Sequence, residues 1–211
     1  FKKTEEFAVI YMKYFKARTQ HKARVLSEYS SLGGDKISPF DDLIKEESKR
    51  LDWDWKLLAA VIYEESKFVA DAESWTGAGG LMQLIPETAE RFGADSIADP
   101  VQNIHAGVGF LKTLEEYWSE EIPDSNERVP FVLASYNVGL GHMLDAVRLT
   151  EKYGSNKFDW NEVQVYLALK ADPEYYKDTV VKHGYCRGAE PVVYVKDILT
   201  LWSHYQNTGS N

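Results

Sequence analysis

Apolar residues recur every three or four positions over most of the chain, which is the spacing that places them on one face of an α-helix. Two such stretches follow Asp99-Pro100 and Glu190-Pro191, and an acidic residue followed by proline is typical of a helix start. The apolar positions behind them are Val101, Ile104, Val108, Leu111, Leu114 and Trp118 in the first stretch and Tyr194, Ile198, Leu201, Trp202 and Tyr205 in the second.

Further helix boundaries are indicated by proline and glycine. Asp172-Pro173 and Ser38-Pro39, with Asp41 in the first turn, predict two more helix starts, and Gly93 and Gly184 predict helix ends. No run of strand length alternates between apolar and polar residues. The pattern therefore predicts an all-α domain of roughly seven to nine helices.

The first 35 residues are predicted to be a segment of their own. Their apolar positions at helical spacing indicate a short amphipathic helix, and the polar run with Gly33-Gly34 indicates a linker. The positions are Phe7, Ile10, Tyr11, Tyr14 and Phe15. We expect residues 1–35 to be the trailing segment of a missing upstream module, residues 36–207 to be the main domain, and residues 208–211 to be a tail.

The segment from Trp55 to Phe68 is apolar on almost every side of the predicted helix and ends in two adjacent carboxylates, Glu64 and Glu65. A carboxyl group beside a low-dielectric wall has a raised pKa, which a general acid needs near neutral pH. Each glutamate continues one of the two apolar stripes, so periodicity does not choose between them. The alternative is an ordinary helix end with two solvated glutamates.

A glycine-rich loop follows at residues 74–86. Gly77, Gly79 and Gly80 allow the backbone to approach a ligand or to adopt a positive φ, and the apolar run behind them anchors the loop in the core. The loop lacks the Gly-Lys-Ser/Thr pattern of a phosphate-binding loop. On its own it is also compatible with a turn between two helices.

Composition narrows the choice of partners. The chain has 211 residues, 44% hydrophobic and 27% charged, and its longest apolar run, from Leu57 to Tyr63, is too short to span a bilayer. The net charge of −9 argues against nucleic acid. Cys186 is the only cysteine, so an intrachain disulfide is excluded, and the five histidines lack zinc-ligand spacing. We expect no metal and no cofactor.

Several segments resemble, in order, the signature of the soluble-lytic-transglycosylase domain family. They are Glu65-Ser66, the loop Gly77-Ala78-Gly79-Gly80-Leu81-Met82-Gln83, Asp99-Pro100 with Asn103-Ile104, Gly107 and Phe110-Leu111, Ala134-Ser135-Tyr136-Asn137-Val138-Gly139, and Glu190-Pro191-Val192-Val193-Tyr194-Val195. Three features resemble the membrane-bound lytic murein transglycosylase F group: the amphipathic N-terminal helix, the Ile37-Ser38-Pro39-Phe40-Asp41 segment and the Gly184-Tyr185-Cys186-Arg187-Gly188 segment. In that group a periplasmic solute-binding-like module precedes the catalytic domain, which would be residues 36–207 here.

The resemblance implies a lysozyme-like all-α fold, of the goose-type lysozyme kind, and an enzyme that cleaves peptidoglycan without water. The bond cleaved is the β-1,4 bond between N-acetylmuramic acid and N-acetylglucosamine. The resemblance assigns Glu65, the acid followed directly by serine, as the catalytic residue that acts first as acid and then as base. The product would carry a 1,6-anhydro end.

Supporting roles follow from the resemblance, residue by residue. It implies that Gln83 and Met82 contact sugar and that Tyr136 orients the acid or the substrate; for Met82 and Tyr136, plain core packing is the alternative. Ser66, Ser74, Asn137 and Tyr194 are expected to line or shape the substrate site. Glu190 is a second acid of the cleft or merely a complement to its helix dipole. Trp75 departs from the family's usual proline, and is either a sugar-stacking platform or a partly buried anchor.

Two other functions remain open at this point. A goose-type lysozyme-like hydrolase would need a second carboxylate to activate water, for which Asp71 and Glu73 are candidates. A non-catalytic glycan-binding module would share the fold without the activity. If the protein is a transglycosylase, we expect a monomer acting on glycan strands in the periplasm, anchored to the outer membrane through the missing N-terminal part.

Overall fold

The computed structural model describes residues 36–207, and the predicted amphipathic helix, the Gly33-Gly34 linker and the tail lie outside these residues. In the described part the chain forms helices joined by loops, with two isolated β-bridges and no strand. The all-α prediction is confirmed. The helices are α3 (Asp41–Ser48), α4 (Trp55–Ser66), α5 (Pro86–Arg91), α6 (Pro100–Ser119), α7 (Ser125–Val138), α8 (Leu140–Tyr153), α9 (Trp160–Leu169), α10 (Pro173–Tyr176) and α11 (Ala189–Asn207).

Two of the acid–proline pairs begin helices as predicted. The Asp99 carboxylate accepts a hydrogen bond from the Gln102 amide at the start of α6, and Asp172 accepts one from the Glu174 amide at the start of α10. The third pair, Glu190-Pro191, lies inside the first turn of α11 instead of before it.

One boundary prediction was wrong, and another is confirmed with a small offset. The Ser38 hydroxyl accepts from the Phe40 amide at 3.1 Å and the Asp41 carboxylate accepts from the Ser38 amide at 2.7 Å, which is the reciprocal capping expected of a helix start, while the regular helix α3 begins at Asp41. Gly184 has a positive φ of 66° but lies in the loop between α10 and α11, not at a helix end. Gly93, by contrast, follows the C-cap of α5 with a φ of 85°, as expected.

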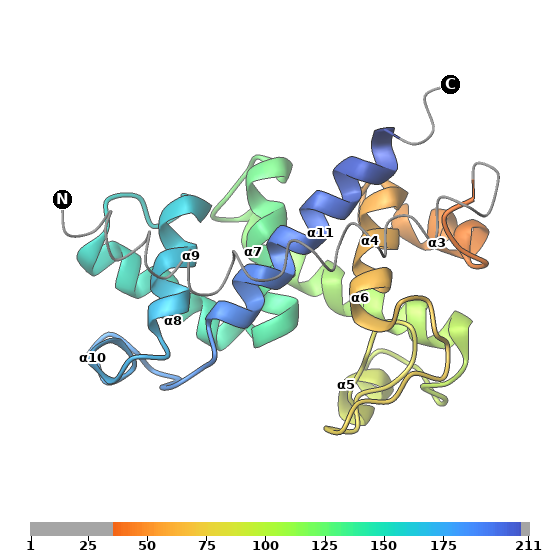
Figure 1. Ribbon diagram of the computed structural model, residues 1–211, viewed down its shortest axis with the longest axis horizontal. Coiled ribbons are helices and arrows are strands. Elements are labelled where there is room, and N and C mark those ends of the chain that lie inside the picture. Colours follow the sequence, from red (N-terminus) through yellow and green to blue (C-terminus); the bar gives the residue numbers. More distant parts are fainter. Residues whose placement is uncertain (1–35, 208–211) are drawn as a thin grey trace, which may run out of the picture.

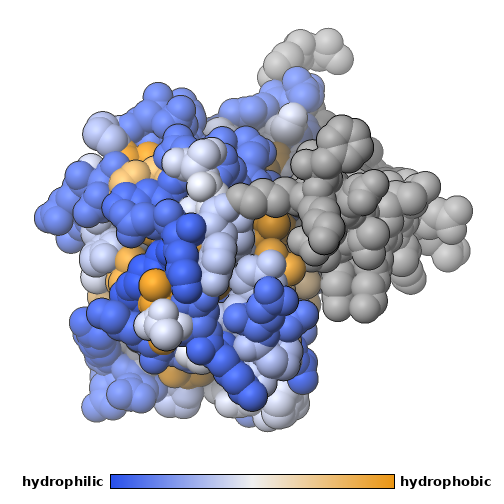
Figure 2. All heavy atoms as spheres, turned by 90° about the vertical axis from the view of Figure 1, so that its left-hand side faces the viewer, coloured by the Kyte–Doolittle hydropathy of each residue, from blue (hydrophilic) through white to orange (hydrophobic). Residues whose placement is uncertain are grey.

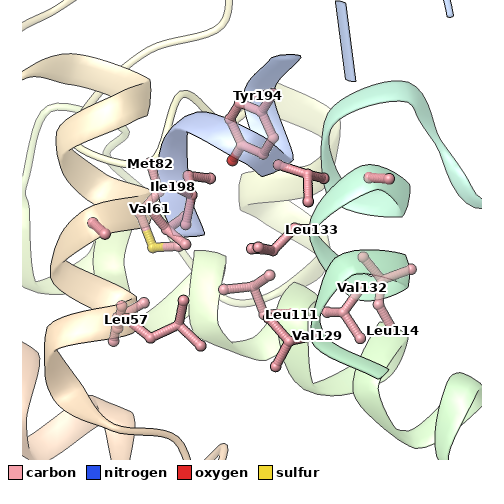
Figure 3. Packing of buried hydrophobic residues seen from close by; sticks show 14 of the residues in the cluster. Leu57, Val61, Met82, Leu111, Leu114, Val129, Val132, Leu133, Tyr194 and Ile198 are labelled. Atoms are coloured by element: carbon pink, nitrogen blue, oxygen red, sulfur yellow. The ribbon is translucent and has the colours of Figure 1, made fainter. Parts of the chain in front are cut away.

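The core is organised around α4, which is buried without interruption from Leu57 to Tyr63. Helix α11 crosses the molecule obliquely and packs against α4, α7 and α9 (Figure 1). Side chains of α4, α6, α7 and α11 meet in the centre, with Val61, Leu111 and Leu133 among them (Figure 3). The predicted burial of α4 on nearly all sides is therefore confirmed.

The remaining helices form the two ends of the molecule. Helices α3, α5 and α6 lie at one end with the loop that follows α4, and α8, α9 and α10 lie at the other (Figure 1). Helix α11 joins the two ends. Over residues 36–207, no helix combines the length and the apolar character that a membrane crossing requires.

Candidate active site

The last turn of α4 and the first half of α11 meet at a pair of side chains, Glu65 and Tyr194. The Tyr194 hydroxyl donates a hydrogen bond of 2.6 Å to Oε1 of Glu65. Tyr194 is buried, whereas Glu65 is partly exposed. The glutamate therefore lies at the edge of the core, with solvent access on one side and a fixed partner on the other.

Burial raises the pKa of Glu65 from its ordinary value of 4.5 to about 7. The Tyr194 hydrogen bond and the Lys67 ammonium work against this shift, since both stabilise the carboxylate, while the neighbouring charge of Glu64 adds to it. A carboxyl group with this pKa exists in both protonation states at neutral pH. It can donate a proton and then accept one.

Substituting Tyr194 with phenylalanine should raise the pKa of Glu65 further, on the order of one unit, because a hydrogen bond to a charged group is worth about 1.5 kcal/mol. An NMR titration of the Glu65 side-chain carboxyl carbon measures this value directly. Tyr117→Phe, which alters a tyrosine packed on Trp118, is the matched control and should leave the titration unchanged. A lowered or unaltered pKa in Tyr194→Phe would contradict the role assigned to the hydroxyl.

The neighbouring Glu64 has a different environment. Its carboxylate forms an ion pair of 3.0 Å with Lys67, the left-handed residue that caps α4. The Lys67 side chain is exposed and that of Glu64 is partly exposed, so Glu64 is a paired residue at the surface of the helix end. Both interpretations of this helix end are thus realised, one by each glutamate.

Burial raises the pKa of Tyr136 well above its ordinary value, and the charge of Glu65 adds to this shift. The Tyr136 hydroxyl donates a hydrogen bond of 2.7 Å to the Met82 carbonyl, and its ring packs on Phe110 with the ring centroids 5.2 Å apart. Tyr136 thereby fastens the glycine-rich loop to α7. These two contacts fix both the position of the Tyr136 ring and the partner of its hydroxyl.

The Met82 side chain is fully buried and does not face a ligand. It lies beside the central side chains of α4 and α11 (Figure 3), and a Cβ at Gly107 would come within 2.3 Å of its sulfur. The expected contact of Met82 with sugar is therefore corrected to core packing, the alternative that the sequence left open. Met82 is apolar because its side chain anchors the loop in the core.

Asn103 holds this loop in place, a function that the sequence reasoning missed. Its fully buried amide donates to the carbonyls of Gly79 and Ile97 and accepts from the Met82 amide at 2.8 Å. A Cβ at Gly80 would lie 2.2 Å from the Asn103 nitrogen, so glycine is required there. In the sequence, Asn103 appears only as part of the family-like motif behind Asp99-Pro100, without an indication of this role.

Gln83 and Ser74 organise the loop from within. The Gln83 side-chain nitrogen donates to the carbonyls of Ala72 and Gly80, at 3.1 and 3.0 Å, and the residue has a positive φ of 47°. The Ser74 hydroxyl accepts from the Ala78 amide and bonds to the Thr76 hydroxyl. The Gln83 amide is thus oriented before any ligand binds.

Trp75 lies at the tip of the turn, with 95% of its surface exposed. The turn itself is closed by a hydrogen bond from the Gly77 amide to the Ser74 carbonyl and by one from the Ser74 amide to the Ala78 carbonyl. If Trp75 were a partly buried anchor, most of its side chain would be shielded from solvent by neighbouring residues. Trp75 is therefore held out into solvent by a well-bonded turn, which excludes the anchor interpretation.

The other candidates are spread around this centre. Ser66 is buried, and its hydroxyl donates to the Ile62 carbonyl within α4. Asn137 is exposed at the end of α7. Glu190 is exposed, pairs with Arg187 at 3.5 Å, and lies one helical turn before Tyr194 on α11.

Neither of the two candidates for a second, water-activating carboxylate acts on the pKa of Glu65. Asp71 and Glu73 are both exposed. The charged groups that act on the pKa of Glu65 are Glu64 and Lys67. Over residues 36–207 no cluster of three histidine, cysteine, aspartate or glutamate side chains is placed to hold a metal ion.

Solved structures with this fold are known. The chain is similar to an inactive mutant of the lytic transglycosylase Slt from Pseudomonas aeruginosa, with a TM-score of 0.57 and 22% identity over 87% of this chain and 27% of that one. It is also similar to the 70 kDa soluble lytic transglycosylase of Escherichia coli, with a TM-score of 0.57 and 21% identity over 81% of this chain and 25% of that one. These likenesses confirm the lysozyme-like fold class.

The amino-acid sequence is also similar to those of longer proteins. The chain is 37% identical over 201 residues to a membrane-bound lytic murein transglycosylase F of Desulfosudis oleivorans, covering 95% of this chain and 44% of the relative. It is 36% identical over 178 residues to that of Cellvibrio japonicus, covering 82% and 35%. The chain thus spans less than half the length of these relatives. The profile described as "Transglycosylase SLT domain" matches residues 42–159, more than half of the chain, which therefore belongs to this family.

Proposed function

We propose that this chain is a peptidoglycan lytic transglycosylase in which Glu65 is the only catalytic carboxyl group. The observation that carries the proposal is the Glu65 carboxyl at the edge of the core, with a pKa of about 7 and a hydrogen bond from Tyr194. Glycoside hydrolases of the usual kind need a second carboxylate, either to activate water or to attack the sugar. A transglycosylase does not, because its nucleophile belongs to the substrate.

The reaction then needs one group that changes its protonation state. Protonated Glu65 donates its proton to the glycosidic oxygen, and the bond from that oxygen to C1 of the muramyl residue breaks. The C6 hydroxyl of the same residue forms the new bond to C1, and Glu65, now a carboxylate, takes the hydroxyl proton. Atoms and charges balance without water, and Glu65 is again protonated at the end.

Tyr194 and Tyr136 assist without exchanging protons. The Tyr194 hydroxyl stabilises the carboxylate form of Glu65 after the first proton transfer. Tyr136 holds the Met82 carbonyl, and with it the loop in front of the acid. Burial raises the pKa of both tyrosines well above the ordinary value, so each remains a neutral donor at working pH.

We assign substrate contacts to the polar and aromatic residues around Glu65. Gln83 is oriented by its two bonds to the loop backbone, and Trp75 offers a free aromatic face. Ser74, Asn137 and Glu190 complete the set, while Ser66 acts through its packing under the acid. Met82 is left out because its side chain is buried.

The decisive experiment is an analysis of the products. Mass spectrometry of digested peptidoglycan should show 1,6-anhydromuramyl ends. Reducing muramyl ends would instead identify a hydrolase of the goose-type lysozyme kind, with Asp71 or Glu73 as the candidate second carboxylate. Binding without any cleavage would identify a glycan-binding module.

We further infer the setting of the enzyme from its substrate and its relatives. Relatives at 36–37% identity are named membrane-bound, and peptidoglycan lies in the periplasm. We therefore place the catalytic domain in the periplasm, acting as a monomer, with an outer-membrane anchor and a solute-binding-like module upstream. Residues 1–35 would then be the end of that module.

Removal of residues 1–35 tests this boundary. Residues 36–207 contain the hydrophobic cluster around α4 and every catalytic group assigned here, so the shortened protein should fold and cleave peptidoglycan at a rate close to that of the full chain. Circular dichroism and product release measure the two properties. A shortened protein that fails to fold, or folds without activity, would assign the segment to the catalytic domain.

Trp75→Ala should weaken the binding of a chitooligosaccharide about fivefold with little change in melting temperature, because a stacked aromatic contributes about 1 kcal/mol and this one is not packed in the fold. Isothermal titration and thermal unfolding measure both effects. Trp75→Phe keeps an aromatic face and should restore most of the affinity. Unchanged affinity in Trp75→Ala would remove this residue from the substrate site.

A further inference from the structure

Aromatic and basic side chains of α10 and of the loop before α11 lie together, and all but the half-buried Tyr176 are exposed. This group of side chains consists of Tyr176, Lys177, Tyr185 and Arg187 and is called the Arg187 strip here. Tyr176 and Tyr185 pack edge to face with their ring centroids 5.7 Å apart, and the Lys177 ammonium lies 5.8 Å from the Tyr176 ring centroid. Side chains from α10 and from the loop before α11 thus form one surface.

The loop before α11 presents its side chains alternately to the core and to solvent. Cys186 and Gly188 are buried, whereas Tyr185 and Arg187 are exposed. Glycine is required at position 188, because a Cβ there would lie 1.6 Å from the Leu167 carbonyl oxygen. Tyr185 and Arg187 therefore face solvent on the same side of the chain.

Two contacts and one turn of α11 connect the strip with Glu65. Arg187 pairs with Glu190 at 3.5 Å, and Glu190 lies one turn, about 6 Å along α11, before Tyr194. Tyr194 in turn donates to Glu65. A substrate bound at Glu65 that extends along the start of α11 would reach the Arg187 strip.

The loop is held rigidly by a buried ion pair. The Asp145 carboxylate accepts hydrogen bonds from the Lys182 and His183 amides, both at 2.8 Å, and from the fully buried Lys170 ammonium at 2.8 Å. The loop backbone is thus tied to α8 and to the end of α9. Its outward side chains are preorganised for a ligand.

The charge of the strip is opposite to that of the whole protein. The chain has 33 acidic and 24 basic residues, whereas the two charged residues of the strip, Lys177 and Arg187, are cations, with the carboxylates of Glu174 and Glu190 at its borders. Figure 2 shows this end of the molecule with a mostly hydrophilic surface. Arg187 and Glu190 are 71% and 66% exposed, and such a pair contributes little to stability, so Arg187 can exchange Glu190 for a better placed carboxylate.

We propose that the Arg187 strip binds the carboxylate-bearing peptide stem of peptidoglycan, an inference that rests on the proposed function. The N-acetylated sugars carry no charge once the lactyl carboxyl group of the muramyl residue is joined to the peptide, so the anionic groups of the substrate are on the peptide. A guanidinium binds a carboxylate through two parallel hydrogen bonds, and Tyr185 and Tyr176 offer an apolar face for the peptide chain.

Cleavage of two substrates tests the proposal: glycan strands that keep their peptides, and the same strands after an amidase has removed them. In Arg187→Gln the ratio of kcat/KM on peptide-bearing strands to that on peptide-free strands should fall about tenfold. Arg187→Lys keeps the charge without the paired hydrogen bonds and should lie in between. The matched control is Lys49→Gln, which removes a cation of 71% exposure from a similar pair with Glu46 on α3 and should leave the ratio unchanged.

An equal loss on both substrates, which leaves the ratio unchanged, would overturn the assignment and place Arg187 on the glycan. Activities that stay at the wild-type level on both substrates would show that Arg187 contacts neither the peptide nor the glycan. A wild-type protein that produces no anhydro ends from either substrate would instead contradict the proposed function. The two failures are therefore distinguishable. Circular dichroism of each variant shows that the fold is retained.

Discussion

Glu65→Gln is expected to abolish cleavage of peptidoglycan while leaving glycan binding intact. The amide has the shape of the carboxyl group but can neither donate the first proton nor accept the second. Loss of one general acid–base group costs about 10²–10⁴ in rate, and here both steps depend on the same residue. Release of anhydro products measures the loss, and binding of a chitooligosaccharide shows that the site is intact.

The same variant is expected to be more stable than the wild type above pH 7. The pKa of Glu65 is about 7 in the folded protein, against an ordinary value of 4.5. The unfolded chain therefore loses this proton first as the pH rises, and the carboxylate form favours unfolding by at most about 3 kcal/mol. The gain in Glu65→Gln should be absent below pH 4.5, grow up to pH 7 and remain constant above it, as urea unfolding at several pH values will show.

Glu64→Gln is the matched control for both effects. It changes an adjacent glutamate at the same helix end, whose carboxylate is paired with Lys67 outside the core. This variant should keep its activity and show no comparable gain in stability at high pH. Loss of cleavage in Glu64→Gln with full activity in Glu65→Gln would show that the wrong carboxylate has been assigned.

Asp145→Asn is expected to cause the largest loss of stability, about 3–5 kcal/mol, because it leaves a buried ammonium group without a counter-ion. The Lys170 and Asp145 side chains are fully buried and 2.8 Å apart. The Lys170 hydrogen bond and two loop amides also hold the pKa of Asp145 at about 2 against its burial. The contribution of the pair is therefore present above the ordinary value of 3.8 and is lost as the pH falls through 2.

Urea unfolding of a double-mutant set measures this loss. The double variant Asp145→Leu with Lys170→Met removes both charges together and should cost less than the sum of the two single variants. Lys49→Met, which removes one member of an exposed pair on α3, should change the free energy of unfolding by no more than about 0.5 kcal/mol. Equal effects of Asp145→Asn and Lys49→Met would show that burial does not govern the pair.

The helical part of the fold was predictable because its signals are local. The burial of α4 followed from an apolar sequence on both of its faces, and the starts of α6 and α10 followed from an aspartate that caps the helix before a proline. The prediction failed at Gly184, which lies in the loop between α10 and α11. A glycine with positive φ is used in loops as well as at helix ends, and the local sequence does not distinguish the two.

The site was predictable in its residue types and not in its contacts. The order of the motifs identified Glu65, the glycine-rich loop, Tyr136 and Tyr194. It did not indicate that Asn103 supports the loop, because that role depends on three bonds to distant backbone atoms. The order of the motifs also did not indicate that, within one loop, the Met82 side chain is buried and the Trp75 side chain is exposed.

The sequence by itself determined the helical class, the buried helix with its two terminal glutamates and the family resemblance, since these depend on the spacing of residues along the chain. The resemblance assigned the catalytic role to Glu65, and only the tertiary structure gave the two glutamates their different environments. Glu65 receives the Tyr194 hydroxyl from α11 and loses part of its hydration, whereas Glu64 stays with Lys67 outside the core. The pKa of a carboxyl group depends on desolvation and on nearby charges and donors, and folding brings these together from distant parts of the sequence.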